Sequence, residues 1–385
     1  MKKIAIVTGT RAEFGLLSPL MDKIQEDKEM QLQLIVTAMH LSPEFGYTVD
    51  EIEEKGYKID SKVECLLSSD TAVGVTKSVG LATIGFADAF TNLSPDVVVI
   101  LGDRTEMLAA ATSALLANIP IAHIHGGETT EGAYDENIRH AITKMSYLHF
   151  ASAKIYRQRI IQLGEHPDRV FNVGAIGLDS IKNMDILNKE EFEQSINFKL
   201  GRKNILITFH PVTLEDDSAK DQFNAILEAL DALEETHFIF THANSDKSGR
   251  VINQMIEQFV NKNRERAVAF KSLGHLRYLS ALEHIDMVLG NSSSGIIEVP
   301  YFNIPTVNIG DRQKGRILSE SIIQSETTVD AITLALQKAL DIAFRKRIEN
   351  QVQLYGSGNT AEKIMDILRN QNINSLKKSF YDIQF

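Results

Sequence analysis

Short apolar runs alternate with longer amphipathic segments along most of the chain. In the first half the strand-like runs are KIAIVT, QLQLIVT, DVVVILG, PIAHIH, YLHFAS and VFNVG. Helical spacing covers residues 16–25, 71–92 and 104–118 between them. The apolar residues of DVVVIL follow one another without polar alternation, which is typical of a strand covered on both faces. Strands and helices that take turns in this way predict a doubly wound parallel sheet.

The pattern is interrupted once and then resumes. Residues 179–203 are polar and contain no strand-like run, so we expect a domain boundary there. Beyond it come NILITF, HFIFTH, VAF, DMVLG and PTVNIG, with helical segments between them. We therefore expect an α/β protein whose two Rossmann-like domains, 1–178 and 179–360, face each other across a cleft. The remaining segment, 361–385, is expected to form a helix that packs back on the first domain.

Composition narrows the class of protein. A net charge of -11 over 385 residues makes nucleic acid an unfavourable partner. The single cysteine, Cys65, allows no internal disulfide and favours a reducing compartment. No apolar stretch approaches the roughly 20 residues of a membrane span, and the run after the two N-terminal lysines is too short for a signal peptide. We expect a soluble, cytoplasmic protein with no membrane partner.

Three carboxylates stand where strands end or a helix begins. Asp103 follows DVVVILG, Glu128 follows PIAHIH, and Asp135 opens the helix that continues with Arg139 and His140. Ends of neighbouring parallel strands share one edge of the sheet, where ligands bind. We expect the three carboxylates to converge there and to perform acid/base chemistry on a small molecule. The alternative is that Asp103 and Asp135 only cap their helices.

The loop after the first strand, GTRAEFG, carries a cation. It is not the dinucleotide pattern G-x-G-x-x-G, because Arg11 stands where the second glycine belongs, and it is not a Walker loop. We expect Arg11 to bind phosphate or carboxylate. The alternative is that Arg11 pairs with Glu13 on the surface.

The second half offers an anion site in LGNSSSGIIEVP. The expected helix start contains Ser292, Ser293, Ser294 and Gly295. Free backbone N–H groups and hydroxyls at such a start bind phosphate. The alternative is that Ser292 or Ser294 is merely the N-cap. Further along, NIGDRQKGR is a basic loop after a strand, or else a solvated run of charges.

Histidines add two further hypotheses. His210 follows the strand NILITF and could donate to a phosphate oxygen, although a lone histidine is more often structural. His123 and His125 are two positions apart, so on a strand they would share one face. With Glu128 they could ligate a metal, but the acid/base interpretation explains Glu128 without one. We expect no metal.

These motifs carry a resemblance to a known family. GTRAEFG, LGDRTE, HIHGGE, YDENIRH, FHPVT, GNSSSGIIEVP and NIGDRQKGR span the chain from Gly9 to Arg316. In this order they resemble the hydrolysing UDP-N-acetylglucosamine 2-epimerases of sialic acid biosynthesis. The resemblance implies the two-domain glycosyltransferase-B (GT-B) fold and the conversion of UDP-N-acetylglucosamine and water to N-acetylmannosamine and UDP. The sequence differs from that of the related non-hydrolysing epimerases at two places. Those enzymes have a lysine where this chain has Leu16, and a Gln-His-Arg-Glu stretch where this chain reads AMHLSPEFG.

The resemblance also implies roles for individual residues. Asp103, Glu128 and Asp135 would be the acid/base carboxylates, and His210 would be a further catalytic residue that holds UDP. The residues implied to bind the UDP-sugar are Arg11, Arg104, Asn244, Ser272, Ser292, Ser293, Ser294, Gly295, Glu298 and Arg312. Ser272 would lie near the uracil.

The implied mechanism is anti elimination of UDP to a 2-acetamidoglucal, followed by hydration. It needs no redox step, so we expect no cofactor besides the UDP-sugar substrate, and we expect a homo-oligomer, a dimer or a tetramer. Three alternatives stay open. One is a sister enzyme that acts on UDP-2,4-diacetamido-2,4,6-trideoxyglucose in legionaminic acid biosynthesis. The others are a glycosyltransferase of the same fold and a non-catalytic nucleotide-sugar binding protein.

Overall fold

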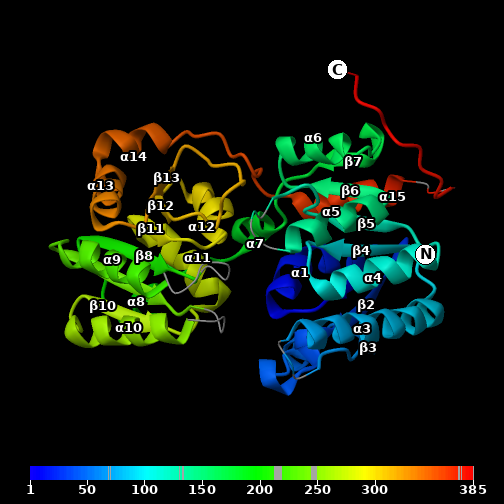
Figure 1. Ribbon diagram of the computed structural model, residues 1–385, viewed down its shortest axis with the longest axis horizontal. Coiled ribbons are helices and arrows are strands. Elements are labelled where there is room, and N and C mark those ends of the chain that lie inside the picture. Colours follow the sequence, from blue (N-terminus) through cyan, green and yellow to red (C-terminus); the bar gives the residue numbers. More distant parts are fainter. Residues whose placement is uncertain are drawn as a thin grey trace. The chain divides into compact units, whose positions relative to one another are not determined.

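The computed structural model consists of two compact α/β units (Figure 1). It describes residues 1–67, 69, 71–129, 131, 134–211, 219–243, 249–371, 373 and 375–384. Unit 1 comprises Met1–Glu128, Tyr134–Lys182 and Tyr355–Phe385, and unit 2 comprises Thr129–Ala133 and Asn183–Leu354. Strands and helices alternate in both units, as the hydrophobic pattern predicts.

Unit 1 is built on a parallel sheet in the order β3-β2-β1-β4-β5-β6-β7. Its strands are β1 (Lys2–Thr8), β2 (Met30–Thr37), β3 (Ile59–Val63), β4 (Val97–Leu101), β5 (Ile121–Ile124), β6 (Leu148–Ala151) and β7 (Val170–Asn172). Its helices are α1 (Arg11–Glu26), α2 (Val49–Glu54), α3 (Ala72–Leu93), α4 (Thr105–Leu116), α5 (Asp135–Met145), α6 (Lys154–Gln162), α7 (Gly177–Asn183) and α15 (Thr360–Asn370). Short 3-10 turns cover Ala38–Leu41, Pro43–Phe45 and Pro167–Arg169.

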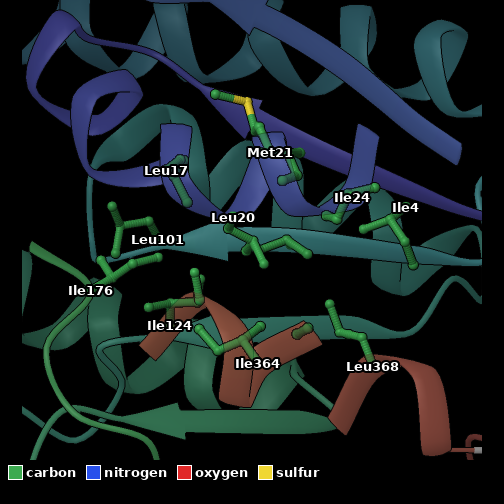
Figure 2. Close-up of a cluster of buried hydrophobic side chains, with 14 of the residues drawn as sticks. Ile4, Leu17, Leu20, Met21, Ile24, Leu101, Ile124, Ile176, Ile364 and Leu368 are labelled. Atoms are coloured by element: carbon green, nitrogen blue, oxygen red, sulfur yellow. The ribbon is translucent and has the colours of Figure 1, made fainter. Parts of the chain in front are cut away.

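Both faces of this sheet are buried. Successive strand residues point to opposite sides of the sheet, and helices pack on each side. Ile4 and Ile6 of β1 pack on one side with α1 and α15, whereas Ala5 and Val7 pack on the other with α3 and α4. Figure 2 shows the first cluster, in which Leu17 and Leu20 of α1 approach β4 and Ile364 of α15 lies near Ile124 of β5. Because helices cover both faces of the sheet, functional side chains are expected in the turns at the carboxyl ends of the strands.

The last helix belongs to unit 1 and is capped by a residue far away in sequence. Asp179 is buried and accepts hydrogen bonds from the backbone N–H groups of Thr360 (2.7 Å) and Ala361 (2.6 Å). The sequence predicts domain boundaries after residues 178 and 360. The contacts instead place residues 179–182 and 355–360 in unit 1, because α7 and the start of α15 are tied together by this cap.

Unit 2 repeats the architecture with a parallel sheet in the order β10-β9-β8-β11-β12-β13. Its strands are β8 (Lys203–Thr208), β9 (Thr236–Thr241), β10 (Ala267–Phe270), β11 (Met287–Gly290), β12 (Thr306–Ile309) and β13 (Ile322–Ser325). Its helices are α8 (Lys189–Ile196), α9 (Ala219–Asp231), α10 (Gly249–Lys262), α11 (Gly274–His284), α12 (Ser294–Ile297), α13 (Val329–Leu340) and α14 (Ile342–Ile348), with a 3-10 turn at Val299–Phe302.

No helix within the ranges given above is long and apolar enough to cross a membrane.

Candidate active site

The polar residues of unit 1 gather at the ends of its central strands. β4 is followed by Asp103 and β5 by the turn that carries Glu128, and the two strands are hydrogen-bonded neighbours. Gly127, just before Glu128, has φ +75°, and an added Cβ would lie 2.6 Å from the carbonyl oxygen of Tyr156. Only glycine satisfies both conditions without strain. Gly127 therefore fixes the turn from which Glu128 leaves the sheet.

Arg139 of α5 joins the two strand ends. Its Nη2 donates to Oδ2 of Asp103, and its Nη1 donates to the carbonyl oxygen of His125 at 3.1 Å and lies 3.9 Å from Oε2 of Glu128. The arginine is buried, so its charge is compensated by these partners rather than by water. Arg139 is a site residue for which no role was predicted from the sequence. The signal was present, since Arg139 follows Asp135 by four positions on one helix face.

Glu128 is also held by two donors other than Arg139, namely Ser152 and His125. Its carboxylate is 1 % exposed and accepts a 2.6 Å hydrogen bond at Oε1 from the Ser152 hydroxyl. Nδ1 of His125 lies 3.3 Å from the same oxygen. Nε2 of His125 accepts from the backbone N–H of Ile176 at 3.2 Å, so Nδ1 carries the proton and donates to Glu128. A buried carboxylate with several donors keeps one fixed orientation.

Asp135 is the first residue of α5 and is half-buried. Burial raises the pKa of its carboxyl, Arg104 and Arg139 oppose the shift, and Glu106 adds to it. The N-cap alternative for the two aspartates is wrong, because the N-cap positions of α4 and α5 are Arg104 and Tyr134. Asp135 therefore interacts with the charge of Arg139, the residue that also contacts Asp103.

Arg104 is tethered within unit 1. Its Nε lies 2.6 Å from Oε1 of the buried Glu106. Glu106 in turn faces Glu13, whose pKa is raised to about 8 by burial and then by the charge of Glu106. Glu13 also forms a capping box with Thr10 at the start of α1. Arg104 is therefore held near Asp135 with its charge partly compensated, and its contact with UDP stays a prediction.

Arg11 lies on the surface of unit 1. Its Nε is 3.0 Å from Oε2 of Glu51, and its side chain is 67 % exposed. The alternative pairing of Arg11 with Glu13 is wrong, because the carboxylate of Glu13 accepts from the backbone N–H groups of Gly9 and Thr10. An exposed ion pair costs little to break, so Arg11 remains available for the anion that the sequence predicts.

His123 and His125 do not share a strand face. β5 ends at Ile124, and His125 lies in the turn beyond it with φ +65°. His123 is buried and its Nε2 donates to the carbonyl oxygen of Gly102 at 2.7 Å, next to Asp103. Burial lowers the pKa of His123 to about 3, so the ring is neutral. Across the described parts of the chain, no group of three His, Cys, Asp or Glu side chains is arranged for a metal ion.

In unit 2, the side chain of Asn291 forms two hydrogen bonds with the backbone of His210. Its Oδ1 accepts from the backbone N–H of His210 at 2.8 Å, and its Nδ2 donates to the His210 carbonyl oxygen at 2.7 Å. Gly290 before it has φ +141°, and an added Cβ would lie 1.8 Å from the carbonyl oxygen of Thr208. Burial and then the charge of Arg312 lower the pKa of His210 to about 4. At neutral pH the ring is uncharged and can offer a hydrogen bond to an anion.

The basic loop after β12, NIGDRQKGR, is hydrogen-bonded to the same asparagine. Arg312 Nη1 donates to the carbonyl oxygen of Asn291 at 3.0 Å, and Gln313 Nε2 donates to it at 2.9 Å. Neither Asn291 nor Gln313 was singled out by the sequence analysis. Two donors on one backbone oxygen fix the loop after β12 to the turn after β11, which places Arg312 beside the serine-rich segment.

The serines lie around a very short helix. α12 has four residues, and its N-cap is Ser293, whose side chain makes no capping hydrogen bond, rather than Ser292 or Ser294. Tyr278 donates to Oγ of Ser294 at 2.7 Å, and Ser292 and Ser294 are 3.0 Å apart between their Oγ atoms. The hydroxyls thus form a hydrogen-bonded chain that starts at Tyr278. Capping the helix would require only one serine.

The other predicted binding residues are placed as follows. Gly295 is buried against Thr306, which lies 3.1 Å from where a Cβ would be. Glu298 follows α12, and burial raises its pKa to about 7. Ser272 is exposed and accepts from the backbone N–H of Gly274 at 3.1 Å. Asn244 lies outside the described residues.

The fold and these residues define a two-domain α/β protein of the GT-B type with a carboxylate cluster in one unit and a serine-rich turn in the other. A solved structure of Neisseria meningitidis UDP-GlcNAc 2-epimerase bound to UDP-GlcNAc has a similar fold, with a TM-score of 0.82, 19 % identity, and coverage of 96 % of this chain and 100 % of that one. The family model for UDP-N-acetylglucosamine 2-epimerase matches residues 22–369. The chain therefore belongs to this family of UDP-sugar 2-epimerases.

Three curated relatives align over nearly the whole chain. A Campylobacter jejuni protein named GDP/UDP-N,N'-diacetylbacillosamine 2-epimerase (hydrolyzing) is 45 % identical and covers 99 % of both chains. A Legionella pneumophila protein named UDP-N,N'-diacetylbacillosamine 2-epimerase (hydrolyzing) is 37 % identical over 96 % of both. The Escherichia coli polysialic acid biosynthesis protein P7 is 36 % identical over 100 % of this chain and 98 % of its own.

Proposed function

We propose that the protein is a hydrolysing 2-epimerase of UDP-2,4-diacetamido-2,4,6-trideoxyglucose, which is UDP-N,N'-diacetylbacillosamine. The products would be UDP and 2,4-diacetamido-2,4,6-trideoxymannose, which suits legionaminic acid biosynthesis. The observation that carries the choice of sugar is the 45 % identity, over 99 % of both chains, to a relative with that name. The 37 % identical relative supports the same sugar. The diacetamido sugar thus replaces UDP-N-acetylglucosamine as the preferred substrate.

The chemistry is assigned to unit 1. The first step removes the C2 proton while the C1–O bond to UDP breaks, which gives a glycal. Water then adds a hydroxyl at C1 and a proton reaches the opposite face of C2. Asp103 and Glu128, which face Arg139, are proposed as the ionised bases, because a guanidinium hydrogen bond is strongest to a charged carboxylate. Asp135, with its raised pKa, is proposed as the acid.

The nucleotide contacts are assigned to unit 2. His210 would donate one hydrogen bond to the departing diphosphate, and Arg312 would supply charge. Donors aimed at charge that develops on the leaving group are typically worth about 10²–10³ in rate each. The hydroxyls of Ser292, Ser293 and Ser294 would add neutral donors. Arg11, Arg104, Asn244, Ser272, Gly295 and Glu298 complete the proposed binding set.

A second candidate is the conversion of UDP-N-acetylglucosamine to N-acetylmannosamine for sialic acid biosynthesis. It is favoured by the description of the family model and by the 36 % identical relative, which is named for polysialic acid biosynthesis. The two sugars differ at C4 and C6, away from the C1 and C2 atoms that react. The proposed acid/base residues therefore serve both candidates equally.

Steady-state kinetics with purified protein distinguishes the candidates. We expect kcat/KM for the UDP-diacetamido sugar to exceed that for UDP-N-acetylglucosamine by at least about tenfold. Recognition of one additional substrate group typically changes kcat/KM by about 10–200-fold. The GDP-linked diacetamido sugar is included, because one relative carries GDP in its name. Equal or reversed kcat/KM values for the two UDP-sugars would contradict the proposed substrate.

A further inference from the structure

Residues 375–384, beyond α15, lie against unit 1 beside the end of α6 (Figure 1). The backbone N–H of Tyr381 donates to the carbonyl oxygen of Gly164 at 3.0 Å. Gly164 has φ +87°, and an added Cβ at this position would overlap the ring of Phe380. Only glycine accommodates both the backbone angle and the ring. These contacts fix the position of residues 375–384, which we call the 375–384 segment.

The 375–384 segment places a lysine at the C-terminal end of α5. Nζ of Lys378 donates to the carbonyl oxygens of Lys144 at 2.8 Å and of Ser146 at 2.7 Å. Lys144 is in the last turn of α5, and Ser146 is its C-cap. The last carbonyl groups of a helix have no partner within the helix, and a lysine that bonds to them also interacts favourably with the helix dipole. Lys378 therefore caps α5 from 232 positions beyond Ser146.

A buried carboxylate holds the ammonium group of Lys378 in place. Glu165 is 1 % exposed, and Nζ of Lys378 lies 3.1 Å from its Oε1 and 3.0 Å from its Oε2. Burial acts to raise the pKa of the Glu165 carboxyl, but hydrogen bonds from His149 and the two lysines lower it to about 2. Glu165 is therefore ionised at neutral pH. An ammonium group has three N–H donors, and Lys378 has three acceptor groups for them, two backbone carbonyls and this carboxylate.

The position of α5 depends on anchors of this kind. The side chain of its N-cap, Tyr134, forms no capping hydrogen bond with the described residues of the first turn. The helix begins at Asp135, and Arg139, one turn further on, contacts Asp103. A helix of 11 residues is a short, stiff element, so a loosened C-terminal end also displaces the residues nearer its start. Groups in a reactive site have to be held to within about 0.5 Å.

We propose that Lys378 is a positioning residue: it caps α5 and thereby holds Asp135 and Arg139 at the carboxylate cluster. This role rests on the proposed function, because it concerns groups to which acid/base chemistry is assigned there. Lys378 acts through α5 and is given no contact with the substrate.

Hydrogen–deuterium exchange measures the cap without any substrate. In Lys378→Met we expect the amides of α5 to exchange at least about fivefold faster than in wild type, because even a modest loss of local stability shifts the opening equilibrium by that factor. Lys377→Met is the matched control, since it removes the same charge from the exposed neighbouring residue. If Lys378→Met does not fold, Lys378→Gln is compared with Lys377→Gln in the same way. Equal exchange of α5 in the Lys378 and Lys377 variants would overturn the proposal.

Steady-state kinetics with the UDP-diacetamido sugar connects the cap to catalysis. We expect Lys378→Met to lower kcat by roughly tenfold or more, with KM and UDP affinity unchanged, because the proposed nucleotide contacts lie outside α5. Lys378→Arg keeps charged N–H donors and should recover much of the lost kcat.

Two kinetic results would contradict the positioning role. One is a kcat for Lys378→Met equal to that of Lys377→Met, and the other is a loss confined to KM. A wild type that converts neither UDP-sugar would instead overturn the proposed function and with it the positioning role, whereas the exchange of α5 would still report whether Lys378 caps the helix.

Discussion

The Ser152 hydroxyl donates a 2.6 Å hydrogen bond to Oε1 of Glu128. Ser152 follows β6, Glu128 follows β5, and the two strands are neighbours in the sheet. Both side chains are buried, so water cannot replace the bond if it is lost. Ser152 thus positions a carboxylate that we propose to be catalytic, although it has no chemistry of its own in the reaction.

Replacement of Ser152 by alanine should lower kcat by roughly tenfold to a hundredfold, because a hydrogen bond to a charged group contributes about 1.5–3 kcal/mol. KM should change little, since Glu128 is not proposed to bind the nucleotide. Ser113→Ala is the matched control: it removes another buried serine hydroxyl of unit 1, one that donates to Thr83. If the two variants had equal kcat values, Ser152 would have only a structural role.

The fork of Arg139 predicts a strong difference between arginine and lysine. Arg139→Lys keeps the charge but cannot reach Asp103 and the His125 carbonyl oxygen in the same geometry. We expect kcat to fall by at least about tenfold, and further in Arg139→Ala. Arg157→Lys serves as control, because Arg157 also donates to two backbone carbonyl groups in unit 1. Kinetics that are unchanged in Arg139→Lys would exclude the bridging role.

Glu13 makes stability depend on pH. Its pKa in the folded protein is raised to about 8 from 4.5, so the folded state favours the neutral form. The stability that this provides is complete below about pH 4.5 and is lost as the pH rises through about 8. Glu13→Gln should remove this slope, which can reach about 1 kcal/mol per pH unit. Urea unfolding from pH 5 to 8 measures it, with the exposed Glu26→Gln as control. Identical slopes for wild type and Glu13→Gln would contradict the assignment.

The long-range cap at α15 should be important for unit 1. Asp179→Ala removes the acceptor for the first two N–H groups of α15, and we expect a loss of about 2 kcal/mol in the free energy of unfolding. Asp341→Ala removes an exposed cap from α14 in unit 2 and should cost less. Differential scanning calorimetry compares the two. An Asp179→Ala protein no less stable than Asp341→Ala would show that the cap contributes little.

The sequence predicts most of the strands because buried parallel strands are continuous apolar runs. It misses β3, whose residues IDSKV are polar and mostly half-buried at the edge of the sheet. It also misses β13, an edge strand of four residues, IIQS, which is too short for a distinct apolar run. Such strands are formed by pairing with a neighbour rather than by their own hydrophobic pattern.

Most of the candidate-site residues that the sequence indicates follow a strand; Asp135, at the start of a helix, is an exception. Asp103 and Glu128 stand directly after apolar runs, so topology alone brings them to one edge. Ser152 follows a strand in the same way, but a serine carries no distinctive signal. Asp179 and Thr360 are 181 residues apart, and no local pattern could pair them. Long-range hydrogen bonds of this kind require the fold itself.

The most direct test of the central claim is NMR of the reaction with the UDP-diacetamido sugar in D₂O. Elimination followed by hydration predicts that free UDP and the 2-epimeric sugar appear together, and that the product carries deuterium at C2. Asp103→Asn, Glu128→Gln and Asp135→Asn should each slow the reaction by roughly 10² or more, and release of the glycal by any of them would expose the intermediate. Accumulation of the epimerised nucleotide-sugar, or a product that retains its original hydrogen at C2, would contradict the account.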